Sequence, residues 1–237
     1  MATVLLVRHG RTDANASGVL AGWTPGISLD ETGVAQAAAL AARLASVPLA
    51  AVVSSPLERC QETAAAIIGA REGLTAQVDD RIAECRYGEW TGRKLSELAK
   101  EPLWKVVQQH ASAARFPGPD GESILDMQHR AVESVREWDS RLGPDAVWVA
   151  VSHADVIKAT LADALGQHLD TFQRIQIDPC SLSVVRYTPL RPFVLRVNDV
   201  GGSVDGLIPP KRRRGTRRPK AGDSDAVVGG GAGSGST

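Results

Sequence analysis

The chain has few cysteines, and nothing in their arrangement indicates a covalent framework. Three occur among 237 residues, widely spaced and never in a C-x-x-C pair: Cys60, Cys85 and Cys180. An odd, scattered set argues against both a disulfide framework and a zinc site. No cluster of Asp or Glu suggests another metal site either. We therefore expect reduced thiols in a cytoplasmic protein that needs no metal ion or other cofactor.

Long apolar runs are also missing from the sequence. No stretch approaches the roughly 20 residues that a helix needs to span a bilayer. The first residues, Met1 to Val4, lack a basic region ahead of an apolar segment, so they do not resemble a signal peptide. Hydrophobic content of 43% and charged content of 23% are ordinary for a soluble globular protein.

The formal net charge is zero, but the charges are unevenly distributed. Residues 211–237 hold seven Lys or Arg and two Asp, whereas the rest holds 20 basic and 25 acidic residues, a net of −5. We predict one globular domain over 1–200 and a basic, then Gly/Ser-rich, disordered tail over 201–237. The acidic body does not suggest nucleic-acid binding. Lys211 to Lys220 could make weak contact with nucleic acid or an anionic membrane, but a solvated tail is the simpler interpretation because no aromatic residue is interleaved there.

Strand and helix patterns alternate along the body of the chain. Short apolar runs rich in branched residues predict buried strands at 4–7, 50–53 and 147–151, and Val78 suggests another. The remaining predicted elements are a helix capped by Asp30, a helix with Pro56 at its first position, a helical excursion over 90–121, helices over 123–142 and 155–165, and strands at 182–187 and 193–197. This order predicts an α/β fold, a three-layer α/β/α sandwich around a mainly parallel mixed sheet.

Charged side chains follow three of the predicted strands. Arg8 and His9 end the first strand, Arg59 comes shortly after the second, and His153 follows the strand at 147–151. Ligands bind beyond the carboxyl ends of parallel strands, so these side chains should meet at one edge of the sheet. Two histidines and two arginines with a nearby carboxyl group indicate a phosphate site.

Four segments resemble the phosphoglycerate-mutase-like branch of the histidine phosphatase superfamily, and together they span roughly residues 1–200. They are Val7-Arg8-His9-Gly10-Arg11-Thr12-Asp13-Ala14-Asn15, Ser54-Ser55-Pro56-Leu57-Glu58-Arg59-Cys60-Gln61-Glu62-Thr63-Ala64, Glu84-Cys85-Arg86-Tyr87-Gly88-Glu89-Trp90-Thr91-Gly92 and Val151-Ser152-His153-Ala154. A lone R-H-G tripeptide would be weak evidence. The presence of all four in the family's order and spacing is specific.

The resemblance implies a catalytic role for each matching side chain. His9 would be the nucleophile that takes a phosphoryl group, because a neutral imidazole is nucleophilic near pH 7. Arg8 and Arg59 would bind the phosphoryl oxygens with their guanidinium forks. His153 would donate a further hydrogen bond to a phosphoryl oxygen.

Glu84 matches the family's general acid, which protonates the leaving oxygen and later deprotonates water. Glu89, Asp79 and Asp80 are alternative carboxyl groups, and the register of the motif favours Glu84. Asn15 and Gly22 match positions that line the substrate entrance, and Ala21 and Ala154 are predicted with them as substrate-binding residues. His110, His129 and His168 are expected to be surface or helix residues.

The chain departs from the mutases of the family at several positions. Ala21 stands where they carry Ser or Thr, and Ala154 replaces a frequent Gly. The segment 94–115 is shorter than theirs and lacks the adjacent arginines with which they hold a bisphosphorylated ligand. These differences favour a phosphatase.

Three functions compete on this sequence. The first is a metal-independent phosphomonoester hydrolase that acts through a phosphohistidine on a small phosphorylated metabolite. The second is a cofactor-dependent phosphoglycerate mutase. The third, a non-catalytic phospholigand-binding protein, is disfavoured because a binder needs no acid opposite a nucleophile. The sequence does not name the metabolite, and it leaves the oligomeric state open, with a homodimer among the alternatives.

Overall fold

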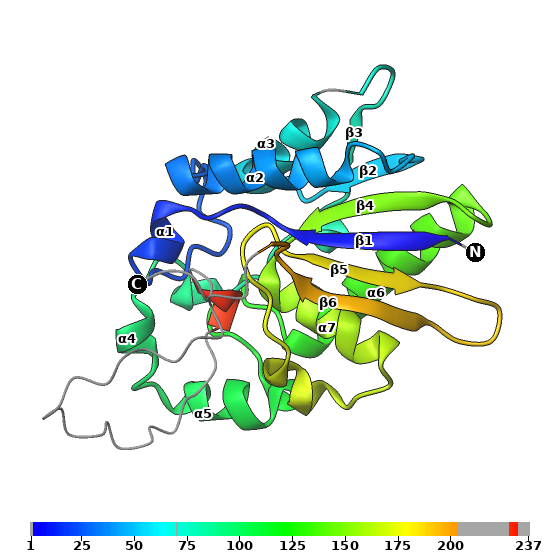
Figure 1. Cartoon of the computed structure of the whole chain (residues 1–237). Helices are drawn as coiled ribbons and strands as arrows, with labels where there is room; N and C mark the ends of the chain where they lie inside the picture. Colours follow the sequence, from blue (N-terminus) through cyan, green and yellow to red (C-terminus); the bar gives the residue numbers. More distant parts are fainter. Residues whose placement is uncertain (1, 70, 203–227, 232–237) are drawn as a thin grey trace, which may run out of the picture.

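One mixed sheet runs through the middle of the molecule (Figure 1). The computed structural model describes residues 2–69, 71–202 and 228–231, and within these ranges the strand order is β3-β2-β4-β1-β5-β6. The strands are β1 (Thr3–Arg8), β2 (Ala51–Ser54), β3 (Ala76–Val78), β4 (Val147–Ser152), β5 (Leu182–Arg186) and β6 (Phe193–Asp199). β1 to β4 are parallel, and β5 is antiparallel to both of its neighbours. The predicted mainly parallel mixed sheet is confirmed.

Helices cover both faces of this sheet, with α2 and α3 on one face and α6 and α7 on the other (Figure 1). The helices are α1 (Asp13–Ala16), α2 (Glu31–Leu44), α3 (Glu58–Ile68), α4 (Leu95–Leu98), α5 (Pro102–Gln109), α6 (Ile124–Leu142) and α7 (Ala154–Ala164). Short 3-10 helices are η1 (Asp80–Ile82), η2 (Gly88–Trp90), η3 (Ala111–Ala113), η4 (Leu169–Arg174) and η6 (Val228–Gly230). The three-layer α/β/α sandwich is therefore confirmed.

The two faces of β1 explain why its sequence is apolar without interruption. Val4 and Leu6 belong to the hydrophobic cluster that includes α6 and α7, whereas Leu5 and Val7 belong to the cluster with α2 and α3. Successive side chains of a strand point to opposite faces, so a strand that is covered on both sides needs an apolar residue at every position. β4 follows the same rule and pairs with β1 residue by residue.

The predicted cap of α2 is confirmed, Ser123 caps α6 without having been predicted to do so, and the predicted start of α3 is wrong. The Asp30 carboxylate accepts the Gly33 N–H (2.7 Å) at the start of α2, and the Ser123 hydroxyl accepts the Asp126 N–H (3.0 Å) at the start of α6. Pro56 is not the first residue of α3, which begins at Glu58. The backbone is still extended at Leu57 (φ −75°, ψ 139°), which is the N-cap, so the helix starts two residues later than predicted.

Part of the predicted tail lies outside the described residues, including the basic segment from Lys211 to Lys220. Val228 to Gly231 are described, and they pack against the body of the molecule (red in Figure 1). No helix within the described ranges combines the length and the apolar character needed to cross a membrane.

Replacing Asp30 tests how much the N-terminal cap of α2 contributes to the free energy of unfolding. We expect Asp30→Ala to lower the free energy of unfolding by about 1–2 kcal/mol, since the Gly33 N–H loses its acceptor and Arg11 loses its ion partner (2.7 Å). Urea denaturation followed by circular dichroism measures this. Glu31→Ala, one residue along on the exposed side of the helix, is the control, and equal effects of the two changes would contradict the capping role.

Candidate active site

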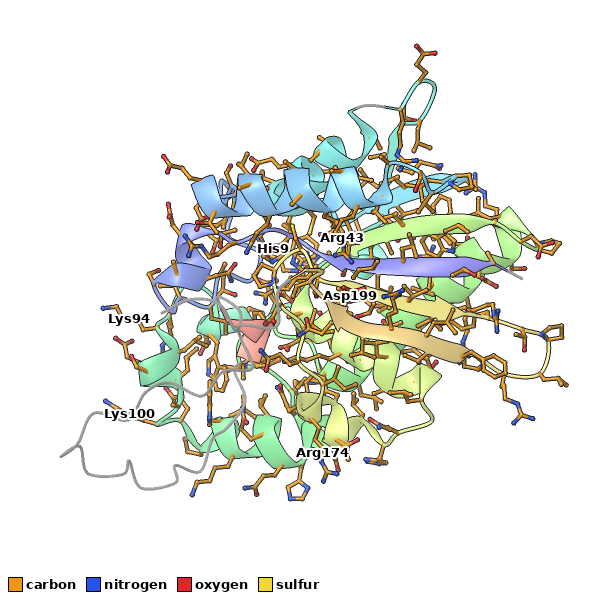
Figure 2. The ribbon with its side chains drawn as sticks, viewed as in Figure 1. His9, Arg43, Lys94, Lys100, Arg174 and Asp199 are labelled. Atoms are coloured by element: carbon orange, nitrogen blue, oxygen red, sulfur yellow. The ribbon has the colours of Figure 1, made fainter. Side chains whose placement is uncertain are left out.

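The carboxyl ends of three parallel strands bring the predicted residues together. His9 directly follows β1, as Figure 2 shows, and His153 follows β4 at the N-cap of α7. Arg59 lies in the first turn of α3, which β2 leads into. The centres of the two imidazole rings are 5.2 Å apart, and both rings are buried.

His9 has one ring nitrogen engaged with its own loop and the other directed at Arg59. Its Nδ1 lies 2.7 Å from the Gly10 carbonyl oxygen, so Nδ1 carries the proton and donates it to that oxygen. Its Nε2 therefore keeps a lone pair, which accepts from Arg59 Nε at 3.3 Å. Burial, followed by the charges of Arg59 and Arg8, holds the pKa of His9 well below its usual value. The ring is therefore neutral at physiological pH, and a neutral imidazole with a lone pair on Nε2 has the electronic character that a nucleophile requires.

Two buried arginines supply positive charge around this imidazole. Arg59 also donates from Nη2 to the Gly22 carbonyl (2.9 Å), and its buried Nη1 has no hydrogen-bond partner among the described residues. Arg8 donates from Nη1 to the Ile177 carbonyl (2.8 Å). Burial lowers the pKa of Arg8 to about 10, which leaves the guanidinium protonated at neutral pH. Two buried cations this close together favour an anion beside them.

His153 is held by neighbours on both ring nitrogens. Its Nε2 lies 2.8 Å from the Ser55 hydroxyl, and its Nδ1 lies 3.3 Å from Arg59 Nη2 and 3.8 Å from Glu84 Oε2. Burial and the charge of Arg59 hold the pKa of His153 well below its usual value. The ring is therefore neutral and fixed in place. It lies behind Arg59 and is not among the residues that line the pocket.

Glu84 is the buried carboxyl group of the site. Its Oε1 accepts the N–H of Cys85 (3.0 Å), and its backbone carbonyl accepts from Trp23 Nε1 (2.7 Å) and Arg130 Nη2 (3.0 Å). Burial, reinforced by the negative charge of Asp155, raises the pKa of Glu84 to about 7. A carboxyl group with that pKa can both give and take a proton near neutral pH.

The alternative carboxyl groups have other surroundings. Asp79 accepts hydrogen bonds from Arg81, Ser134 and Trp138, and these bonds hold its pKa below the usual range. Glu89 lines a shallow outer groove beside Gly118. Asp80 begins η1 and does not line the pocket. Of these four residues, Glu84 alone lines the pocket, so the geometry favours Glu84 as the carboxyl group of the site.

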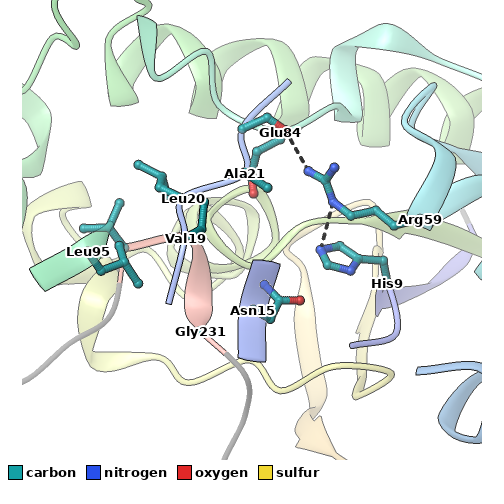
Figure 3. A pocket seen from close by; sticks show the side chains of 12 residues that line it. His9, Asn15, Val19, Leu20, Ala21, Arg59, Glu84, Leu95 and Gly231 are labelled. Carbon is teal, nitrogen blue, oxygen red and sulfur yellow. Dashed lines mark hydrogen bonds between the residues drawn. The ribbon is translucent and has the colours of Figure 1, made fainter. Parts of the chain in front are cut away.

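A small pocket lies over His9, Arg59 and Glu84 (Figure 3). Its wall includes Asn15, Ala21 and Gly22, which the sequence predicts at the entrance; its other lining residues are Val19, Leu20, Leu95, Val228, Gly229 and Gly231. Asn15 uses its side-chain oxygen to cap α1, where it accepts from the Thr12 N–H (3.2 Å). Ala154 is buried at the start of α7 and is not among the lining residues.

Several contributors to the site have no motif of their own in the sequence. Ser55 orients His153, Arg130 holds the loop that carries Glu84, and Trp23 donates to that same loop. Val228 and the glycines beside it come from the predicted tail. Only Ser55, which lies inside a quoted segment, carried a signal that could have identified it. Within the described ranges, no group of three or more His, Cys, Asp or Glu side chains could hold a metal ion.

The chain is a three-layer α/β protein with a buried histidine beside two buried arginines at the carboxyl edge of its sheet. Solved structures match this fold. The structure of YhfR from Bacillus stearothermophilus superposes with a TM-score of 0.76 at 28% identity, covering 85% of this chain and 98% of that one. The structure of a mycobacterial glucosyl-3-phosphoglycerate phosphatase with VO3 gives 0.73 at 26% identity, covering 83% and 99%.

The family is defined by sequence as well. The model of the histidine phosphatase superfamily (branch 1) matches residues 4–200, so this chain belongs to that superfamily. A probable phosphoglycerate mutase, GpmB from Yersinia pestis, is 33% identical over 192 residues, which cover 79% of this chain and 86% of that protein.

The protonation of the two active-site histidines can be measured directly. We expect His9 and His153 to stay neutral at pH 6.0, below the ordinary histidine pKa of about 6.5, because burial and Arg59 oppose a further positive charge. Ring-nitrogen NMR shifts of labelled histidine, assigned with His9→Ala and His153→Ala, report this. They should also identify Nδ1 as the protonated nitrogen of His9. Half-protonation of either ring at pH 6.5 would contradict the expected burial effect.

Proposed function

We propose that the chain is a metal-independent phosphomonoester hydrolase that acts through a phosphohistidine at His9 on a small phosphorylated metabolite. The observation that carries the proposal is the neutral His9 with its lone pair on Nε2, next to two buried guanidinium groups. Because phosphoryl transfer depends mainly on positioning and charge stabilisation, such a site suits a phosphoryl group in transit.

In the first step, the His9 Nε2 lone pair attacks phosphorus, and the bond between phosphorus and the ester oxygen breaks. The leaving oxygen takes the proton of the Glu84 carboxyl group. Arg59 Nη1, a buried donor without a partner among the described residues, is available to a phosphoryl oxygen. The departing alcohol leaves a phosphorylated imidazole and a Glu84 carboxylate.

In the second step, water attacks the phosphorus and the N–P bond breaks. Glu84 takes the proton of that water, which returns the carboxyl group to its first state. Inorganic phosphate leaves, and His9 is again neutral with its proton on Nδ1. The pKa of Glu84, raised to about 7, suits a group that must work in both directions.

A phosphoglycerate mutase is the second candidate, because the relative with 33% identity carries that name. A mutase would convert 3-phosphoglycerate to 2-phosphoglycerate in the presence of 2,3-bisphosphoglycerate without net release of phosphate. Phosphorus NMR of one reaction mixture distinguishes the two functions. Free phosphate without the isomer supports the hydrolase, and the isomer without free phosphate supports the mutase.

Replacement of the nucleophile tests the proposal. We expect His9→Ala to reduce release of para-nitrophenol from para-nitrophenyl phosphate by about 1,000-fold or more, because no other group can take the phosphoryl. The wild type should need no added metal and should keep its activity in EDTA. His129→Ala, on α6 beside an outer groove, is the matched control. Full activity of the His9 variant would rule out the phosphohistidine.

Glu84→Gln separates proton donation from binding. For an alkyl phosphate such as β-glycerophosphate, kcat/KM should fall about 100- to 10,000-fold, whereas para-nitrophenyl phosphate, with its stable leaving anion, should lose far less. Because Glu84 acts as an acid with a pKa of about 7, wild-type kcat/KM for the alkyl ester should decline as pH rises above 7. The variant should lack that decline.

The control for this variant is Glu89→Gln. Glu89 lies in the same loop region as Glu84, but it lines the outer groove instead of the pocket. It should keep the wild-type pH profile on both esters. Equal losses on the two esters in Glu84→Gln would show that Glu84 is not the proton donor to the leaving group.

A further inference from the structure

A four-residue turn from the C-terminal part of the chain lies in the candidate active site. We refer to Val228–Gly231 as the strap. It packs beside α7 and forms one wall of the pocket over His9, with Gly231 near Asn15 and Val19 (Figure 3). None of the four family motifs includes it, and the proposed reaction does not use it.

The strap accepts hydrogen bonds from Arg8, the arginine that the family resemblance assigns to the phosphoryl oxygens. Arg8 donates from Nη2 to the Gly231 carbonyl oxygen at 2.5 Å, and the Gly229 carbonyl oxygen lies 3.4 Å from the same nitrogen. A phosphoryl oxygen would seek the same N–H groups, since guanidinium donors bind phosphate oxygens and carbonyl oxygens in the same geometry. The strap carbonyl and a phosphoryl oxygen therefore compete for Arg8.

Two further contacts anchor the strap. The Gly229 N–H donates to Asp155 Oδ2 at 2.9 Å, and that buried carboxylate also accepts from Tyr87 (3.0 Å) and Lys158 (3.2 Å). Val228 is 1% exposed and belongs to the main hydrophobic cluster, in which Leu20, another residue of the pocket wall, also lies. Burial of a valine side chain stabilises by about 1.5–3 kcal/mol, so the strap has an apolar anchor as well as polar ones.

With the strap in place, the pocket is too small for a substrate. The remaining cavity is about 20 Å³, which is enough for about one water molecule and not for a phosphoryl group with its attached alcohol. A strap that closed over a bound substrate would leave room beneath it. This strap fills the site.

We propose that the strap is an autoinhibitory segment that competes with the phosphorylated substrate for the active site. The inference rests on the proposed role of Arg8 in binding the phosphoryl group. Substrate binds only when the strap is displaced, so the apparent affinity falls by the fraction of molecules in the open state. Once substrate is bound, the strap takes no part in the chemistry, so kcat is independent of it.

Full-length point variants test the strap without shortening the chain. Gly229 has φ +73°, and a Cβ there would lie 3.0 Å from Leu20 Cδ1, so Gly229→Val should dislodge the turn. Val228→Asp should do the same by placing a charge in an apolar wall. Gly73→Val is the matched control. Gly73 lies in the connection between α3 and β3, has φ +75°, and has open space where a Cβ would be. Circular dichroism confirms that each variant is folded.

We expect Gly229→Val and Val228→Asp to lower KM for para-nitrophenyl phosphate at least fivefold, with kcat within twofold of wild type. The dissociation constant for orthovanadate, measured by isothermal titration calorimetry, should fall by the same factor, and Gly73→Val should match wild type in both. Unchanged KM and vanadate affinity in both strap variants would overturn the proposal. A lower kcat with a higher KM would also overturn it, because the strap would then close over bound substrate.

The calorimetric measurement keeps the two proposals separate. If neither wild type nor variants hydrolyse any phosphomonoester, but the strap variants bind vanadate more tightly, autoinhibition stands and the hydrolase proposal fails. If the variants hydrolyse para-nitrophenyl phosphate with wild-type KM and bind vanadate with wild-type affinity, the hydrolase stands and autoinhibition fails. Absence of vanadate binding in every variant would overturn the strap as a competitor for a phosphoryl group.

Discussion

The parallel pairing of β1 with β4 is the constraint on which the site depends. The register sets Arg8 opposite Ser152, and the His9 N–H continues the ladder by donating to the Ser152 carbonyl at 3.0 Å. Because both strands end at the same level, the residues that follow them, His9 and His153, lie side by side. A shift of the pairing by one residue would turn the side chains to the opposite faces and separate the two imidazoles.

Burial then gives these side chains their chemical character. His9 and His153 are kept neutral by burial and by Arg59, while Arg8 stays charged in the same surroundings. The Glu84 carboxyl group is pushed in the opposite direction to the histidines, toward protonation. The site thus combines a neutral imidazole, fixed cations and a carboxyl group that holds its proton up to about pH 7, all buried, which suits an anionic group that loses its water on entry.

Much of this arrangement could be predicted from the sequence, because it depends on local patterns. Uninterrupted apolar runs identify doubly covered strands, and the residues after them must reach the same edge. Pro56 lies outside the first turn of α3, despite the preference of proline for that position, because Leu57 remains extended as the N-cap. The raised pKa of Glu84 and the packing of Val228 both depend on burial by distant segments, which no local pattern reports.

The close approach of Gly10 to Gly33 fixes the loop on one side of His9. A methyl group at Gly10 would lie 2.6 Å from the Gly33 carbonyl oxygen, and one at Gly33 would collide with the backbone of Arg11. The loop after His9 and the first turn of α2 are thus in direct backbone contact, with no side chain between them that could be exchanged. Val19, Leu20 and Ala21 line the pocket and carry side chains. Exchange of residues around the pocket is therefore open at those three positions and closed at Gly10, where one methyl group has no room.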